Sequence, residues 1–176
     1  MPAGRGGRCR KQRFGLAVLI GLLPLPVMAE GFAVRDLTSV AADAKTALGG
    51  RYVARAEPAR LTLLCTECEG APMIDVLLGR QADGTEERVR SGQTPVARLE
   101  ALCRQRNPEC RLTGLSVAPA VGWISLYRTG AMSGATAIVL RDGDLLTIRS
   151  LAGDAATASR NARILVEALA PRIVGP

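Results

Sequence analysis

The stretch that decides the fold is residues 135–150, ATAIVLRDGDLLTIRS. Apolar side chains alternate with other residues on both sides of the dipeptide Asp142-Gly143; they are Ile138, Leu140, Leu146 and Ile148. An Asp-Gly pair between two alternating segments indicates a hairpin turn, because both residues tolerate positive φ. The stretch therefore predicts two antiparallel strands, 135–141 and 144–150, each with one buried face.

Further segments before this hairpin have the composition of strands. They are residues 52–55, 60–65, 73–80, 86–89, 111–118 and 122–128. Asp83-Gly84 indicates a turn. We therefore expect the segment after it, 86–89, to return as an exposed edge strand.

Three segments have the spacing and end signals of helices. Residues 36–48 begin at an acidic residue and end at Gly49-Gly50. A second helix is expected to begin at Thr94-Pro95, with Thr94 as N-cap, and to end at Asn107-Pro108. Its apolar face would hold Val96, Leu99, Leu102 and Cys103. A third is expected from Asp154 to about residue 169, ended by Pro171.

The order helix, strands, helix, strands, helix contains no repeated strand-helix alternation. We therefore predict an α+β fold in which a mainly antiparallel sheet is flanked by about three helices. This order is similar to that of α-β-α sandwich domains, many of which are accessory proteins. The similarity is one of predicted topology and implies no site residues. One disulfide-stabilised domain, residues 30–176, accounts for the whole chain after the N-terminal segment.

Residues 1–29 have the order of a secretory signal peptide. Five basic residues precede an apolar run at 14–25, and no acidic residue occurs before Glu30. Val27 and Ala29 place small residues at the positions that signal peptidase requires. The apolar run is shorter than the roughly 20 residues of a membrane-spanning helix. We therefore expect cleavage near Ala29/Glu30, no stable membrane anchor afterwards, and a periplasmic location.

Composition narrows the function classes. Of 23 basic residues, 18 remain after residue 29, against 16 acidic ones, so the strong basicity belongs mostly to the signal segment. This balance and the scarcity of aromatics disfavour nucleic-acid binding. The basic residues are 21 Arg and 2 Lys, which indicates a GC-rich, bacterial genome. Histidine is absent, which excludes Ser-His-Asp and Cys-His catalysis and the commonest ligand of transition metals.

Four cysteines follow the signal segment: Cys65, Cys68, Cys103 and Cys110. An even number in an exported chain predicts two disulfides. Three pairings are possible. We prefer the local one, Cys65–Cys68 with Cys103–Cys110, in which the second bond joins the second helix to the next strand.

Two other hypotheses use the same cysteines. Cys65-Thr66-Glu67-Cys68 resembles the thioredoxin motif in its spacing, which would make the protein a thiol-disulfide oxidoreductase. Glu67 and Glu69 oppose that hypothesis, because negative neighbours disfavour a thiolate. Four thiolates could also bind zinc or copper(I). However, the spacing of Cys103 and Cys110 is not that of a zinc ribbon, so we expect no metal and no cofactor.

The remaining candidates are weaker. Asp142 and Asp144 could be an acid-base or metal pair, but a polar hairpin turn explains them. The glycine-rich residues 129–135 lack the pattern of a phosphate-binding loop. We expect them to be a flexible loop in which Gly130 and Ser133 could contact a ligand. Trp123 and Tyr127 are four apart in a predicted strand, so they share a face and either pack in the core or mark a partner surface.

These observations favour a small exported domain that binds a protein or small ligand and is not an enzyme. The alternative is an oxidoreductase or soft-metal protein using Cys65 and Cys68.

Overall fold

The structure, a computed structural model, describes residues 31–176. Its centre is a seven-stranded sheet in the order β1-β2-β3-β7-β6-β5-β4, with every neighbouring pair antiparallel. The strands are β1 Val53–Glu57, β2 Arg60–Leu64, β3 Met73–Arg80, β4 Arg111–Gly114, β5 Val121–Thr129, β6 Met132–Arg141 and β7 Asp144–Ala152. The predicted α+β class with an antiparallel sheet is confirmed. The expected signal peptide, residues 1–29, lies outside the described residues.

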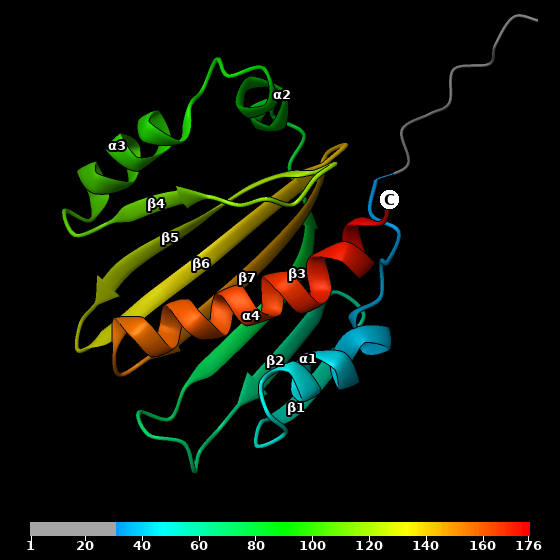
Figure 1. Ribbon diagram of the computed structural model, residues 1–176, viewed down its shortest axis with the longest axis vertical. Coiled ribbons are helices and arrows are strands. Elements are labelled where there is room, and N and C mark those ends of the chain that lie inside the picture. Colours follow the sequence, from blue (N-terminus) through cyan, green and yellow to red (C-terminus); the bar gives the residue numbers. More distant parts are fainter. Residues whose placement is uncertain (1–30) are drawn as a thin grey trace, which may run out of the picture.

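The helices cover the sheet unequally. They are the 3-10 helix η1 Leu37–Val40, α1 Ala41–Ala47, α2 Thr85–Arg90, α3 Val96–Arg106 and α4 Ala155–Val174. Figure 1 shows α4 crossing one face of the sheet, with α1 beside it near β1 and β2, while α2 and α3 lie towards the β4 edge. The contacts of α3 with the sheet are made to β4, and those of α2 to β5. One face of the sheet is thus packed by α1 and α4.

The β6–β7 hairpin occupies the middle of the molecule, as the sequence predicts. Arg141 pairs with Asp144 across a turn in which Asp142 and Gly143 have φ of 52° and 79°. Positive φ at both turn residues is the geometry that an Asp-Gly pair favours. β7 then pairs with β3 on its other side, so the hairpin joins the two halves of the sheet.

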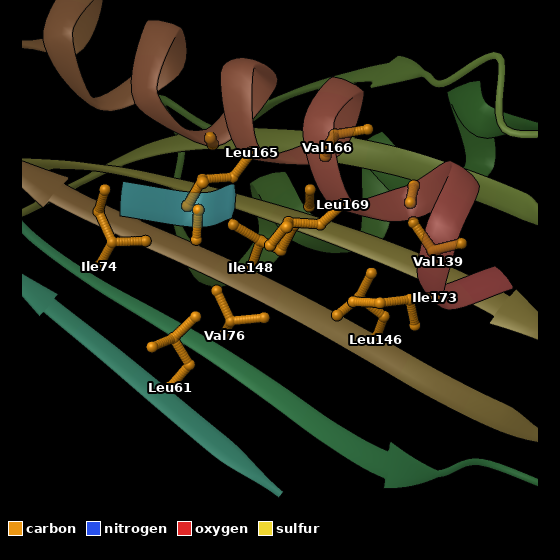
Figure 2. Close-up of a cluster of buried hydrophobic side chains, with 14 of the residues drawn as sticks. Leu61, Ile74, Val76, Val139, Leu146, Ile148, Leu165, Val166, Leu169 and Ile173 are labelled. Carbon is orange, nitrogen blue, oxygen red and sulfur yellow. The ribbon is translucent and has the colours of Figure 1, made fainter. Parts of the chain in front are cut away.

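The core lies between this hairpin and α4. Fully buried residues include Val76 of β3, Ile148 of β7 and Leu165 of α4. Figure 2 shows these side chains meeting those of neighbouring strands and the later turns of α4. Burying a Leu, Ile or Val side chain stabilises the fold by about 1.5–3 kcal/mol. These apolar contacts therefore fix which face of the sheet receives α4.

The last helix begins as predicted but ends later. The Asp154 side chain accepts a hydrogen bond from the Thr157 backbone N–H at 2.8 Å, which caps α4. The prediction that Pro171 ends this helix is wrong. Pro171 is exposed, so the carbonyl that loses its partner can reach water. The next turn is held by the buried Ile173 and by Arg141, whose guanidinium donates to the Val174 carbonyl at 2.7 Å.

The predicted edge strand at 86–89 is also wrong, because these residues form α2. Both edges of β3 are already paired, with β2 and with β7, so a returning strand has no free neighbour there. The helix is stabilised by an ion pair of Glu86 with Arg90, four residues later, at 2.7 Å. Glu86 also accepts the Gly143 N–H at 3.1 Å, which ties α2 to the hairpin turn.

Smaller differences occur around α3 and β4. Pro95, rather than Thr94, occupies the N-cap position of α3, and no side chain caps it. Leu102 is not on the packed face, since it is 52% exposed. The predicted strand 111–118 is paired only over β4, because the chain then leaves β5 through residues 115–120. The first helix, expected at 36–48, is confirmed in place with a 3-10 first turn.

Candidate functional site

The cysteines pair locally, as preferred from the sequence. Cys65 bonds to Cys68, with Cα atoms 5.4 Å apart, and Cys103 bonds to Cys110, with Cα atoms 5.9 Å apart. The second bond joins α3 to the residue before β4, which fastens the helix to the sheet edge. Glu100 of α3 reinforces this junction by accepting the Leu112 N–H at 2.9 Å.

The Cys65–Cys68 bond closes the turn between β2 and β3. Cys65 is buried, Cys68 is half-buried, and the Cys65 N–H donates to the Pro72 carbonyl at 3.2 Å. The turn lies against the start of α4, where Gly70 closely approaches Gly153. Glu67 and Glu69 are exposed in this turn.

A cleft of about 330 Å³ lies beside this turn and includes Cys68 in its wall. At its base the Asn161 amide donates to the Tyr52 hydroxyl at 2.9 Å, and both residues are 5% exposed. Burial raises the pKa of the Tyr52 hydroxyl; the Asn161 hydrogen bond and the positive charges of Arg51 and Arg160 oppose that rise. Sequence reasoning missed this cleft. The available signal was Asn161, a polar residue at a position where helical periodicity places core residues.

The second face of the sheet presents partly exposed side chains, and we call it the open face. Residues directly opposite one another in neighbouring strands share a face. The pairing register therefore aligns a polar row across six strands: Arg55, Thr62, Asp75, Arg149, Thr136 and Ser125. An apolar row lies on one side of it and contains Val53, Leu64, Met73, Leu151 and Tyr127. The row on the other side is mixed and contains Glu57, Arg60, Leu77, Thr147, Ile138 and Trp123.

A buried carboxylate anchors the polar row. Asp75 is 3% exposed and accepts from Arg60 at 2.8 Å and from the Thr62 hydroxyl at 2.9 Å. Its second oxygen is 3.5 Å from Arg149. Burial by itself raises the pKa of Asp75, but the hydrogen bonds and the charges of both arginines outweigh it and hold the pKa below its usual value. The negative charge is thus covered by guanidinium groups that remain half-exposed.

Trp123 and Tyr127 share the open face, as their spacing predicts. Both are half-buried. The Tyr127 ring lies over Gly134, where an added Cβ would overlap it, and its hydroxyl is 3.0 Å from the Thr136 hydroxyl. A glycine opposite an aromatic residue leaves room for the ring to lie against the strand. Both aromatic side chains therefore contribute to the surface of the open face, and the Tyr127 ring lies against β6.

The glycine-rich segment is not the expected flexible loop. Only Gly130 and Ala131 lie outside the strands of the β5–β6 hairpin, and Gly130 has a φ of 59°. Ser133 is paired within β6 and is 3% exposed, so it cannot contact a ligand from a loop. The register of Tyr127 opposite Gly134 accounts for the longer pairing.

The acidic residues of the central turn have different roles. Asp142 is in the turn itself, as predicted. Asp144 is buried, and its carboxylate accepts hydrogen bonds from the Phe32 N–H at 2.8 Å and from the Arg80 guanidinium at 2.6 Å. It also forms an ion pair with Arg35 at 3.1 Å. It therefore fastens the segment before η1 to the end of β3, which the turn interpretation did not foresee.

Within residues 31–176, no three or more His, Cys, Asp or Glu side chains cluster in a way that could hold a metal ion. In the same part of the chain we find no helix with the length and apolar character needed to span a bilayer. No family model matches the chain, and a comparison with curated proteins found no match.

Proposed function

We propose that this chain is an exported, periplasmic binding domain that performs no chemistry of its own and holds a protein partner on the open face. The observation that carries the proposal is the apolar row of this face, which runs across the sheet beside the polar row. Val53 and Leu64 are 70% and 41% exposed there. Contiguous exposed apolar surface rimmed by polar groups is characteristic of interaction sites.

The charges of the open face indicate the chemistry of the partner. The Arg60 and Arg149 side chains are 56% and 47% exposed, whereas the Asp75 side chain between them is 4% exposed. Arg55 adds a further exposed guanidinium, paired with Glu57 at 3.3 Å. A depression of about 400 Å³ lies among these groups on β1 and β2. The partner we propose is a protein with apolar side chains flanked by carboxylates.

The test uses two exposed leucines as matched positions. A photo-crosslinking residue is placed at Leu64 on the open face, or at Leu102 on α3, which is 52% exposed. We expect a discrete adduct with another exported protein from position 64 and none from position 102. That partner, once purified, should bind the chain about tenfold more weakly after Val53→Asp, which introduces a charge into the interface. No adduct, the same adduct from both positions, or an adduct of two copies of this chain would overturn the proposal.

Export is tested separately. The proposal rests on the basic start, the apolar run at 14–25 and the small residues before Glu30. Expression of the full chain in a Gram-negative host should give a periplasmic protein whose intact mass corresponds to residues 30–176. A chain that keeps residues 1–29 and remains in the cytoplasmic fraction would contradict it.

One observation favours a second candidate, a thiol-disulfide oxidoreductase. Cys68 shares its cleft with Arg51 and Arg160, and nearby cations stabilise a thiolate. In such a reaction a substrate dithiol would be oxidised to a disulfide while the Cys65–Cys68 bond is reduced to two thiols. A potential above about −250 mV for this bond, measured by equilibration with glutathione, would favour this candidate. A bond that resists mild reduction would exclude it.

A further inference from the structure

The cleft beside the Cys65–Cys68 turn is built from four separate parts of the chain. The end of α1 and the residues before β1 form one side, and the first turns of α4 form another. The turn between β2 and β3 closes the third side through Cys68, Glu69 and Pro72. The Cys65–Cys68 bond closes the turn that forms the third side, and Asp154 caps the helix that forms the second. The place of the cleft on the core side of β1 separates it from the open face.

The base of the cleft holds a neutral hydrogen-bonding pair. The Tyr52 hydroxyl accepts from the Asn161 amide, so its own proton remains available to a further acceptor. Tyr52 and Asn161 both line the cleft and are both buried. A buried hydroxyl with an uncommitted proton favours an acceptor such as a carboxylate oxygen.

Two guanidinium groups stand at the same cleft. Arg51 and Arg160 line it, and the positive charge of each acts on the Tyr52 hydroxyl. Arg160 is oriented by donating to the Thr157 hydroxyl at 3.3 Å. Both residues are exposed, so their remaining guanidinium N–H groups are accessible to a ligand from solvent. Guanidinium groups bind carboxylates through paired, charge-assisted hydrogen bonds.

We propose that this cleft binds a small organic carboxylate, with the carboxylate held by Arg51 and Arg160 and by the Tyr52 hydroxyl. The inference is independent of partner binding at the open face. A single negative charge suits the site better than a phosphate dianion, because Glu69 also lines the cleft and leaves a modest positive balance. Leu48, Pro72 and Ile164 supply apolar walls for the body of the ligand. The volume of about 330 Å³ is at the small end of ligand sites.

The test is a titration of the oxidised, purified protein with hexanoate, followed by the NMR signals of its amide groups. Hexanamide, which has the same body without the charge, and inorganic phosphate are titrated in parallel. We expect hexanoate to shift the side-chain amide signal of Asn161 in a saturable way. Arg51→Gln and Arg160→Gln should each weaken binding about tenfold, because each removes charge-assisted hydrogen bonds. Arg104→Gln on α3, an exposed arginine outside the cleft, is the matched control and should change nothing.

Tyr52→Phe keeps the ring and removes the hydroxyl, and we expect roughly a twofold to tenfold loss of hexanoate affinity. The proposal is overturned if hexanoate leaves the Asn161 signal unmoved, or if hexanamide binds equally well. It is also overturned if phosphate binds in place of hexanoate, or if the arginine variants bind like Arg104→Gln.

Discussion

Gly134→Ala tests the geometry of the open face, because its effect on the free energy of unfolding should have opposite signs in the presence and in the absence of the Tyr127 ring. An ideal Cβ at position 134 would overlap the Tyr127 ring and lie 2.9 Å from its hydroxyl oxygen. The ring must move aside, and its hydroxyl then leaves Thr136. Overpacking of this kind costs about 1–3 kcal/mol. We therefore expect the free energy of unfolding to fall by that amount in the wild-type background.

The matched background is Tyr127→Ala, in which nothing occupies the space above Gly134. There the same substitution should stabilise the protein by about 0.5–1 kcal/mol, because alanine loses less backbone entropy than glycine in a strand. Urea unfolding of the wild type, both single variants and the double variant gives the coupling free energy, expected to be about 1.5–4 kcal/mol. Equal effects of Gly134→Ala in the two backgrounds would show that the ring does not lie on Gly134, and the shape of the open face would have to be redrawn.

Three further predictions concern stability and are checked by urea unfolding. Asp75 has a folded pKa below its unfolded value, so its ionised form contributes stability above about pH 4, and this is lost as the pH falls through the folded pKa. The stability difference between wild type and Asp75→Asn should therefore narrow in acid; a constant difference would contradict the assignment. Replacing Cys103 and Cys110 together by Ser should lower the free energy of unfolding by about 2 kcal/mol, the loop-closure contribution of a disulfide with this short separation. Reductant should then cause no further loss of stability through this disulfide. Ser150→Ala should gain about 1 kcal/mol, because the Ser150 hydroxyl is fully buried without a hydrogen-bond partner among the described residues; a loss of stability would reveal a partner.

The central hairpin and most strands could be predicted because their signals are local. Asp142-Gly143 requires a turn, and the alternation on both sides of it assigns each side chain to a face. The local disulfides could be preferred for the same reason, since Cys65 and Cys68 are already close along the chain. Strand order could not be predicted, because β3 meets β7 through contacts between residues such as Val76 and Ile148, which no local pattern connects.

The errors arose where packing outweighs local preference. A proline usually ends a helix. At Pro171 the helix continues, because Ile173 is buried against the core and Arg141 donates a hydrogen bond to the Val174 carbonyl. The segment that forms α2 is different, because its local pattern does indicate a helix: Glu86 and Arg90 are spaced for a helical ion pair, a spacing that places no such pair in a strand. The carboxylate of Asp144 could not be assigned because its partner Phe32 is 112 residues away in sequence.

The two proposed sites follow from one property of strands, that successive side chains point to opposite faces. Tyr52 is buried at the cleft, while the next residue, Val53, is 70% exposed on the open face. At the end of β2 the same alternation puts Leu64 on the open face and Cys65 in the core. Neighbouring residues therefore serve different surfaces, and the sheet lies between them. Val53→Asp should consequently weaken partner binding without changing hexanoate affinity, and Arg160→Gln should do the reverse. If either substitution affects both measurements, the sites are coupled through the β1–β2 edge and the open face cannot be treated as a separate binding surface.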